Sequence, residues 1–140
     1  MTRFWWVRHG PTHEKNFVGW RDVPADLSDQ ATIDRLADHL PPNALVISSD
    51  LIRASCTADA ITRERIRLPN HRGLREFNFG AWDGMHFSDV AKRDPILSRQ
   101  FWESPGDISA PDGESWNAVA ARVNGVVDDL IARHTGQDII

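Results

Sequence analysis

The feature of this 140-residue chain that most constrains its fold is a four-residue apolar run near the N-terminus that ends abruptly in polar residues. Residues 4–7 are Phe-Trp-Trp-Val, and Arg8, His9 and Gly10 follow directly. A short apolar run bounded by polar residues predicts a strand covered on both faces, as central strands of parallel sheets are. Ligands of open α/β sheets collect where the chain leaves the carboxyl end of a strand. The sequence therefore predicts a central strand with a site at its end.

The three residues after this strand have the chemistry of an anion site. The guanidinium of Arg8 presents a rigid fork of donors that suits a phosphate or a carboxylate, and His9 can act as a nucleophile or proton carrier near neutral pH. Gly10 lets the backbone approach a ligand closely. A solvated polar turn is the alternative that this tripeptide alone leaves open.

Composition limits the kinds of partner. The chain has 16 Lys and Arg against 20 Asp and Glu, and this mildly acidic balance disfavours nucleic acid, so an anionic ligand needs a local cluster of arginines. The single cysteine, Cys56, cannot form an internal disulfide, and neither a signal peptide nor a membrane span is evident. We expect one domain in a reducing compartment such as the cytoplasm, without a membrane partner.

Periodicity and chain breakers predict the remaining elements. Residues 11–27 contain too many Pro, Gly, Asn and Asp for a regular element and predict a long loop, and loops of this length are often functional. From Asp94 to Pro111 the sequence indicates irregular structure with one helical turn near residues 98–103. The expected elements are helices over residues 28–40, 51–62 and 116–134, and strands over residues 44–47, 66–68 and 138–140.

The helix expected over residues 51–62 carries an arginine in its first turn. Asp50 is a plausible N-cap of this helix. The helix dipole disfavours the cation of Arg53 there, so Arg53 is either exposed and screened by water and Asp50, or it faces a bound anion. In the second case Arg53 and the N–H groups of the first turn lie beside Arg8 at a neighbouring strand end.

A third candidate site lies at residues 74–84, where one carboxylate is set among aromatic residues and turn glycines. Desolvation of Glu76 by Phe77, Phe79 and Trp82 would raise the pKa of its carboxyl toward the range that suits a general acid. An exposed Glu76 that pairs with a neighbouring arginine is the alternative for this stretch taken alone.

Four motifs follow one another along the chain. They are Arg-His-Gly at residues 8–10, Ser-Asp-Leu-Ile-Arg-Ala at 49–54 with Thr-Ala at 57–58, Leu-Arg-Glu at 74–76 with Trp-Asp-Gly at 82–84, and Pro-Asp-Gly-Glu-Ser at 111–115. Together they resemble the histidine phosphatase superfamily, in its phosphoglycerate-mutase-like group that includes the α-ribazole phosphatases. Members often carry Trp-Glu-Gly where this chain has Trp-Asp-Gly. The resemblance implies a three-layer α/β/α fold with a mostly parallel central sheet.

The resemblance also implies a reaction, which is the hydrolysis of a small phosphomonoester without metal or cofactor. His9 would be the nucleophile that takes the phosphoryl group. Arg8 and Arg53 would clamp its oxygens and stabilise their charge. Glu76 would protonate the leaving oxygen and then help to activate water. The partner would be a small phosphorylated metabolite, and a homo-oligomer is compatible with the sequence.

Two further loop residues follow from the resemblance. Thr12 and Asn16 would add neutral hydrogen bonds to the phosphate, although Asn16 lies one residue later than the family pattern places its asparagine. Pro11 replaces the glutamate that usually follows the glycine, and we expect this difference to act on substrate choice.

The end of the chain departs from the family pattern. Members carry a second histidine in a His-Gly pair just after the strand that residues 138–140 begin, and it contributes to the phosphate pocket. We expect that the last strand is missing or incomplete because the sequence is part of a longer chain, with a naturally incomplete member as the alternative. None of the other histidines inherits the position; they are His13, His39, His71, His86 and His134.

Three other functions compete with the phosphatase. A phosphoglycerate-mutase-type enzyme uses the same pocket but retains the phosphoryl group and excludes water. A non-catalytic phosphate-binding or interaction module would suit the absent second histidine. A metal site on His9, His13 and Glu14 is disfavoured because the Gly-Pro pair between the histidines breaks the helix that would align them.

Overall fold

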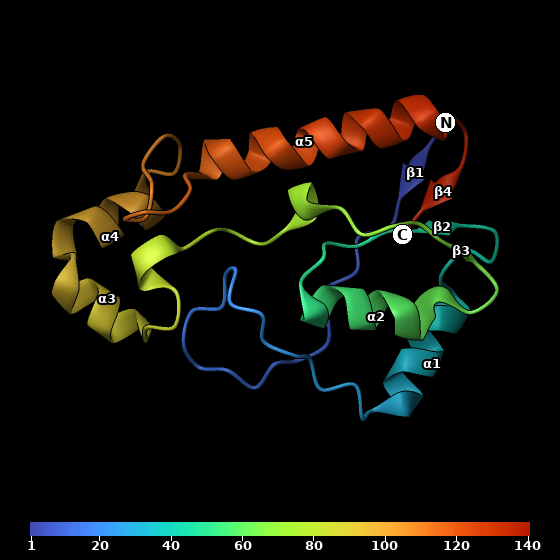
Figure 1. The fold of residues 1–140 in the computed structure, drawn as a ribbon, viewed down its shortest axis with the longest axis horizontal. Helices are drawn as coiled ribbons and strands as arrows, with labels where there is room; N and C mark the ends of the chain where they lie inside the picture. Colours follow the sequence, from blue (N-terminus) through green and yellow to red (C-terminus); the bar gives the residue numbers. More distant parts are fainter. The chain divides into compact units, whose positions relative to one another are not determined.

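A four-stranded parallel sheet in the order β1-β4-β2-β3 lies at the centre of one part of the chain (Figure 1). The structure, a computed structural model, describes residues 1–140. Residues 138–139, where the last strand was expected to be missing or incomplete, form β4, which lies between β1 and β2 and pairs with both. Its hydrogen bonding continues to Ile140, whose carbonyl accepts the Ile47 N–H at 3.0 Å. The strands are β1 (Arg3–Phe4), β2 (Leu45–Val46), β3 (Ile66–Arg67) and β4 (Asp138–Ile139).

Five α-helices accompany the sheet, and none of them is both long enough and apolar enough to cross a membrane. The helices predicted from periodicity are confirmed as α1, α2 and α5. Two more were not predicted as helices: α3 lies where no element was expected, and α4 occupies a stretch for which the sequence indicated a single turn. Their bounds are α1 (Gln30–His39), α2 (Ile52–Thr62), α3 (Phe87–Arg93), α4 (Pro95–Glu103) and α5 (Trp116–Arg133).

Neighbouring residues of the central strands face different helices. Val46 and Ile140 belong to a buried cluster with α1 and α2, whereas Leu45 and Ile139 belong to another with two buried residues near the end of α5. Successive side chains of a strand point to opposite faces of a sheet, so α1 and α2 cover one face and the end of α5 covers the other (Figure 1). This arrangement confirms the three-layer α/β/α fold.

The chain divides into two units whose segments alternate along the sequence. Unit 1 comprises Met1–His13, Asp22–Leu74 and Val126–Ile140, and it contains the sheet. Unit 2 comprises Glu14–Arg21 and Arg75–Gly125. Unit 2 has a separate core. Its buried residues are Phe79, Trp82, Val90, Phe101 and Ala110.

Strand β1 is an edge strand, and the prediction of a covered central strand from its apolar run is wrong. It pairs with β4 on one side, and Trp6 is 72% exposed. The ring of Trp6 stacks on Phe4 with their centroids 6.1 Å apart. A continuous apolar run indicates a strand but does not show which segments cover it.

Candidate functional site

Residues 8–10 are joined to α2 through one threonine of that helix. The Gly10 N–H donates to Thr57 Oγ1 at 3.0 Å, and the Thr57 hydroxyl donates to the Arg53 carbonyl at 2.7 Å. A Cβ added at Gly10 would lie 2.7 Å from a methyl carbon of Leu27, so the Leu27 side chain would have to shift to admit one. The structure thus brings the Arg-His-Gly motif to the first turns of α2, within unit 1.

The ring of His9 is held by the carbonyl of the next residue. His9 Nδ1 lies 2.7 Å from the Gly10 carbonyl oxygen. Because a carbonyl oxygen can only accept, Nδ1 carries the proton, and Nε2 of the neutral ring keeps its lone pair. His9 is half-buried and Arg8 is exposed. In the neutral ring, this contact therefore leaves the free lone pair on Nε2.

Arg53 is buried in the first turn of α2. Its relative exposure is 2%, so the alternative of an exposed, water-screened arginine is wrong. A buried guanidinium is stable only where acceptors or an anion compensate for its lost hydration. The first turn of a helix also presents N–H groups and the positive end of the helix dipole to an anion. The contact of Arg53 with a bound anion stays a prediction.

The N-terminus of α2 is capped from outside the helix. Leu51 is the N-cap residue and makes no side-chain cap bond, so the prediction that Asp50 caps this helix is wrong. Instead, the Ile52 N–H donates to Asp22 Oδ1 at 2.7 Å. A carboxylate is favourable at the positive end of the helix dipole. Nothing in the local sequence indicates this partner, which lies 30 residues away.

We expect Asp22→Ala to lower the free energy of unfolding by about 1 kcal/mol, because the first N–H groups of α2 lose their cap. Urea unfolding followed by circular dichroism measures this loss. Asp22→Asn keeps an acceptor oxygen and should retain most of the stability, and Asp38→Ala at an exposed position of α1 is the matched control. Equal stability of the Asp22→Ala and wild-type proteins would contradict the capping role.

Glu76 lies in unit 2 and is exposed. It belongs to an irregular segment between the 3-10 turns Arg72–Leu74 and Gly80–Trp82, and its Oε1 accepts the Phe77 N–H at 2.8 Å. The expectation that neighbouring aromatic residues desolvate it is wrong, because these residues pack into the core of unit 2 instead.

The remaining predicted site residues belong to the loop over residues 11–27. Thr12 is in unit 1 and Asn16 in unit 2, where Asn16 Nδ2 donates to the Gly84 carbonyl at 3.0 Å. Their contact with phosphate stays a prediction. His13 Nε2 lies 2.8 Å from Asp26 Oδ2, and the structure holds no group of three His, Cys, Asp or Glu side chains placed to bind a metal ion.

Known proteins are similar in sequence to this chain over most of its length. A bifunctional protein of Mycobacterium tuberculosis is 33% identical over 99% of this chain and 40% of its own length. A metal-independent phosphoserine phosphatase of Arabidopsis thaliana is 30% identical over 96% of this chain and 60% of its own length. The chain thus spans about half the length of these curated relatives.

A solved structure and a family model also match this chain over most of its length. YhfR of Bacillus stearothermophilus superposes with a TM-score of 0.88 at 28% identity, over 99% of this chain and 72% of that protein. The model of the histidine phosphatase superfamily (branch 1) matches residues 4–140. The chain therefore belongs to the histidine phosphatase superfamily.

Proposed function

We propose that the protein is a metal-independent phosphatase that hydrolyses a small phosphomonoester through a phosphohistidine on His9. The observation that carries this proposal is the hydrogen bond from the Gly10 N–H to Thr57 Oγ1, which joins the histidine segment to the first turns of α2. The buried Arg53 lies in the first of these turns. The similarity to a metal-independent phosphoserine phosphatase supports the same chemistry.

In the first step, His9 Nε2 attacks the phosphorus atom, and the bond from phosphorus to the leaving oxygen breaks. Glu76 donates a proton to that oxygen. Arg8 and Arg53 stabilise the charge on the three remaining phosphoryl oxygens. The hydrogen bond between His9 Nδ1 and the Gly10 carbonyl keeps the ring oriented and stabilises its positive charge once Nε2 is phosphorylated.

In the second step, water attacks the phosphohistidine. The Glu76 carboxylate accepts a proton from this water, and the bond between phosphorus and Nε2 breaks. The electron pair of that bond returns to Nε2. Orthophosphate leaves, and both His9 and Glu76 are restored to their starting protonation states.

Phosphate release from 4-nitrophenyl phosphate in the presence of EDTA tests the proposal. We expect turnover that EDTA does not reduce, and a phosphoryl label on the protein that survives alkali but not acid, as a phosphoramidate does. Loss of turnover in EDTA would contradict metal independence. Transfer of the phosphoryl group to an added alcohol or phosphoglycerate in place of water would favour the mutase, and phosphate binding without turnover would favour the non-catalytic module.

A further inference from the structure

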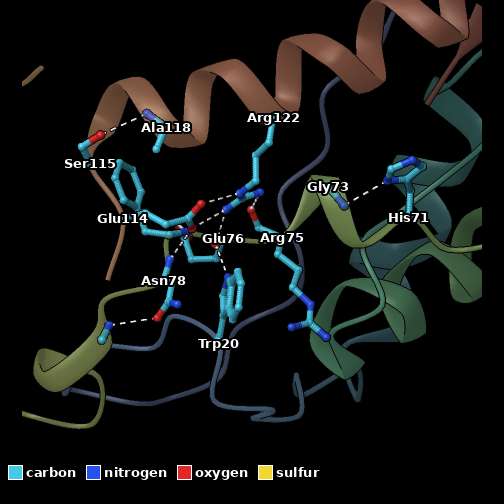
Figure 2. Close-up of polar contacts among 12 residues, drawn as sticks. Trp20, His71, Gly73, Arg75, Glu76, Asn78, Glu114, Ser115, Ala118 and Arg122 are labelled. Atoms are coloured by element: carbon cyan, nitrogen blue, oxygen red, sulfur yellow. Dashed lines mark hydrogen bonds and ion pairs between the residues drawn. The ribbon is translucent and has the colours of Figure 1, made fainter. Parts of the chain in front are cut away.

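The main chain at Glu76 is held by side chains from two other segments of unit 2 (Figure 2). Arg122 donates from Nη1 to the Arg75 carbonyl at 2.6 Å and from Nη2 to the Glu76 carbonyl at 2.8 Å. Trp20 Nε1 donates to the same Glu76 carbonyl at 2.8 Å. Residues 75–79 form neither helix nor strand, so their backbone groups depend on partners outside regular structure. The side-chain donors supply these partners.

Arg122 is in turn held by Glu114. Its Nε and Nη2 bind the two carboxylate oxygens at 2.8 and 2.9 Å, which makes a bidentate ion pair. Glu114 Oε1 also accepts the Asn78 N–H at 2.9 Å, and the Glu114 N–H donates to the Asn78 carbonyl at 2.8 Å. The pair thus connects α5, the motif at residues 111–115 and the segment that carries Glu76 (Figure 2).

The ion pair is shielded from solvent and ionised at neutral pH. The side chains of Arg122 and Glu114 are only 20% and 18% exposed. Burial by itself would raise the pKa of the Glu114 carboxyl, but the hydrogen bonds from Arg122 and the Asn78 N–H lower it below its usual range. Since Arg122 also stays charged, the pair keeps its geometry throughout the neutral pH range.

The start of α5, the helix that carries Arg122, is capped by a buried serine. Ser115 is buried, and its Oγ accepts the Ala118 N–H at 3.1 Å at the start of α5, the helix from which Arg122 extends (Figure 2). The carboxyl of Glu76, by contrast, is exposed. The position of this carboxyl therefore depends mainly on how firmly its own backbone is held.

We propose that Glu114 and Arg122 are positioning residues for Glu76, because their ion pair fixes the main chain that carries the Glu76 carboxyl. The inference rests on the proposed function, in which Glu76 exchanges the proton with the leaving oxygen and with water. Arg122 uses three nitrogens in this arrangement, namely Nε, Nη1 and Nη2. A lysine retains the charge but lacks the planar fork, so it cannot make these contacts together.

Arg122→Lys should slow the release of a poor leaving group selectively. We expect the rate at which glycerol 2-phosphate phosphorylates the enzyme, measured by rapid quench, to fall about 10- to 100-fold, because a small displacement of a proton donor costs about this much. We expect the rate of enzyme phosphorylation by 4-nitrophenyl phosphate to change far less, because nitrophenolate leaves without a proton. KM should stay the same for both esters, since the phosphate ligands in unit 1 are untouched.

A double-mutant comparison shows whether Arg122 acts through Glu76. In a Glu76→Gln protein, adding Arg122→Lys should cause no further loss in the rate of phosphorylation by glycerol 2-phosphate. Arg133→Lys is the matched control, because Arg133 is an exposed arginine of the same helix that pairs with Asp129 at 2.9 Å. We expect it to leave both activities unchanged. Amide hydrogen exchange should be faster at the Asn78 N–H in the Arg122→Lys protein, which reports the loosened segment directly.

The outcomes separate this inference from the function on which it rests. An equal loss in the phosphorylation rate for both esters, no loss for either, or an undiminished effect of Arg122→Lys in the Glu76→Gln protein would overturn the positioning role while the phosphatase stands. Faster exchange at Asn78 with unchanged activity would also overturn it, because the ion pair would then only stabilise the fold. A wild-type protein that hydrolyses neither ester would overturn the proposed function and this inference together.

Discussion

Replacing His9 by alanine is expected to abolish phosphate release, with kcat reduced by about 10⁴-fold or more, as removal of an enzyme's nucleophile generally does. The alanine has no Nε2 to attack phosphorus, and the alkali-stable phosphoryl label should disappear together with turnover. Rapid-quench assays on 4-nitrophenyl phosphate measure both quantities.

The control for this variant is His39→Ala, which removes an exposed histidine from α1 in the same unit. It should retain full activity. Binding of orthophosphate to the His9→Ala protein should persist, because Arg8 and Arg53 are unchanged. Turnover of the His9→Ala protein within about tenfold of wild type would show that another group attacks phosphorus.

Replacing Trp82 by alanine is expected to lower the free energy of unfolding by about 3–5 kcal/mol, the usual cost of emptying a large aromatic site in a core. Trp82 is 0% exposed, and the edge of one ring meets the face of the other where it packs against Phe101 at a centroid distance of 5.3 Å. Its Nε1 also donates to Asp94 Oδ2 at 2.8 Å, next to the start of α4. Urea unfolding followed by tryptophan fluorescence and circular dichroism measures the change.

Two variants test the reason for this loss. Trp82→Phe keeps much of the apolar packing but not the hydrogen bond, so it should cost less than the alanine. Trp6→Ala removes a tryptophan that is 72% exposed and should cost less than about 1 kcal/mol. Equal effects of Trp82→Ala and Trp6→Ala would contradict the role of Trp82 in the core of unit 2.

Both ends of α1, a helix that the sequence predicted, are marked locally. Asp29 accepts the Thr32 N–H at 3.1 Å at the start of α1, and Pro41 follows its last turn. Helix α3 was missed because it has only 7 residues and Pro95 follows it almost directly, and α4 was predicted only as one turn because it has only 9 residues. The edge position of β1 depends on the order of the strands, which no local pattern contains.

The sequence motifs identified candidate site residues but not the contacts that support them. The motifs singled out His9 and Arg53, and the structure joins their segments through Thr57. The cap from Asp22 and the contact of Arg122 with the Glu76 carbonyl join residues 30 and 46 positions apart. Such contacts arise only when distant segments meet, so a single sequence carries no local signal for them.

The central position of β4 has a consequence for the order in which the chain acquires its structure. The register pairs Arg3 with Asp138, and β4 is the neighbour of β1 in the sheet. During synthesis, β1 therefore cannot pair with β4 until nearly all of the described residues have been made. Contacts between such distant positions carry a large loop-closure entropy and slow folding. Within residues 1–140, the segment of His9 that follows β1 therefore gains the support of the sheet only after β4 has been made.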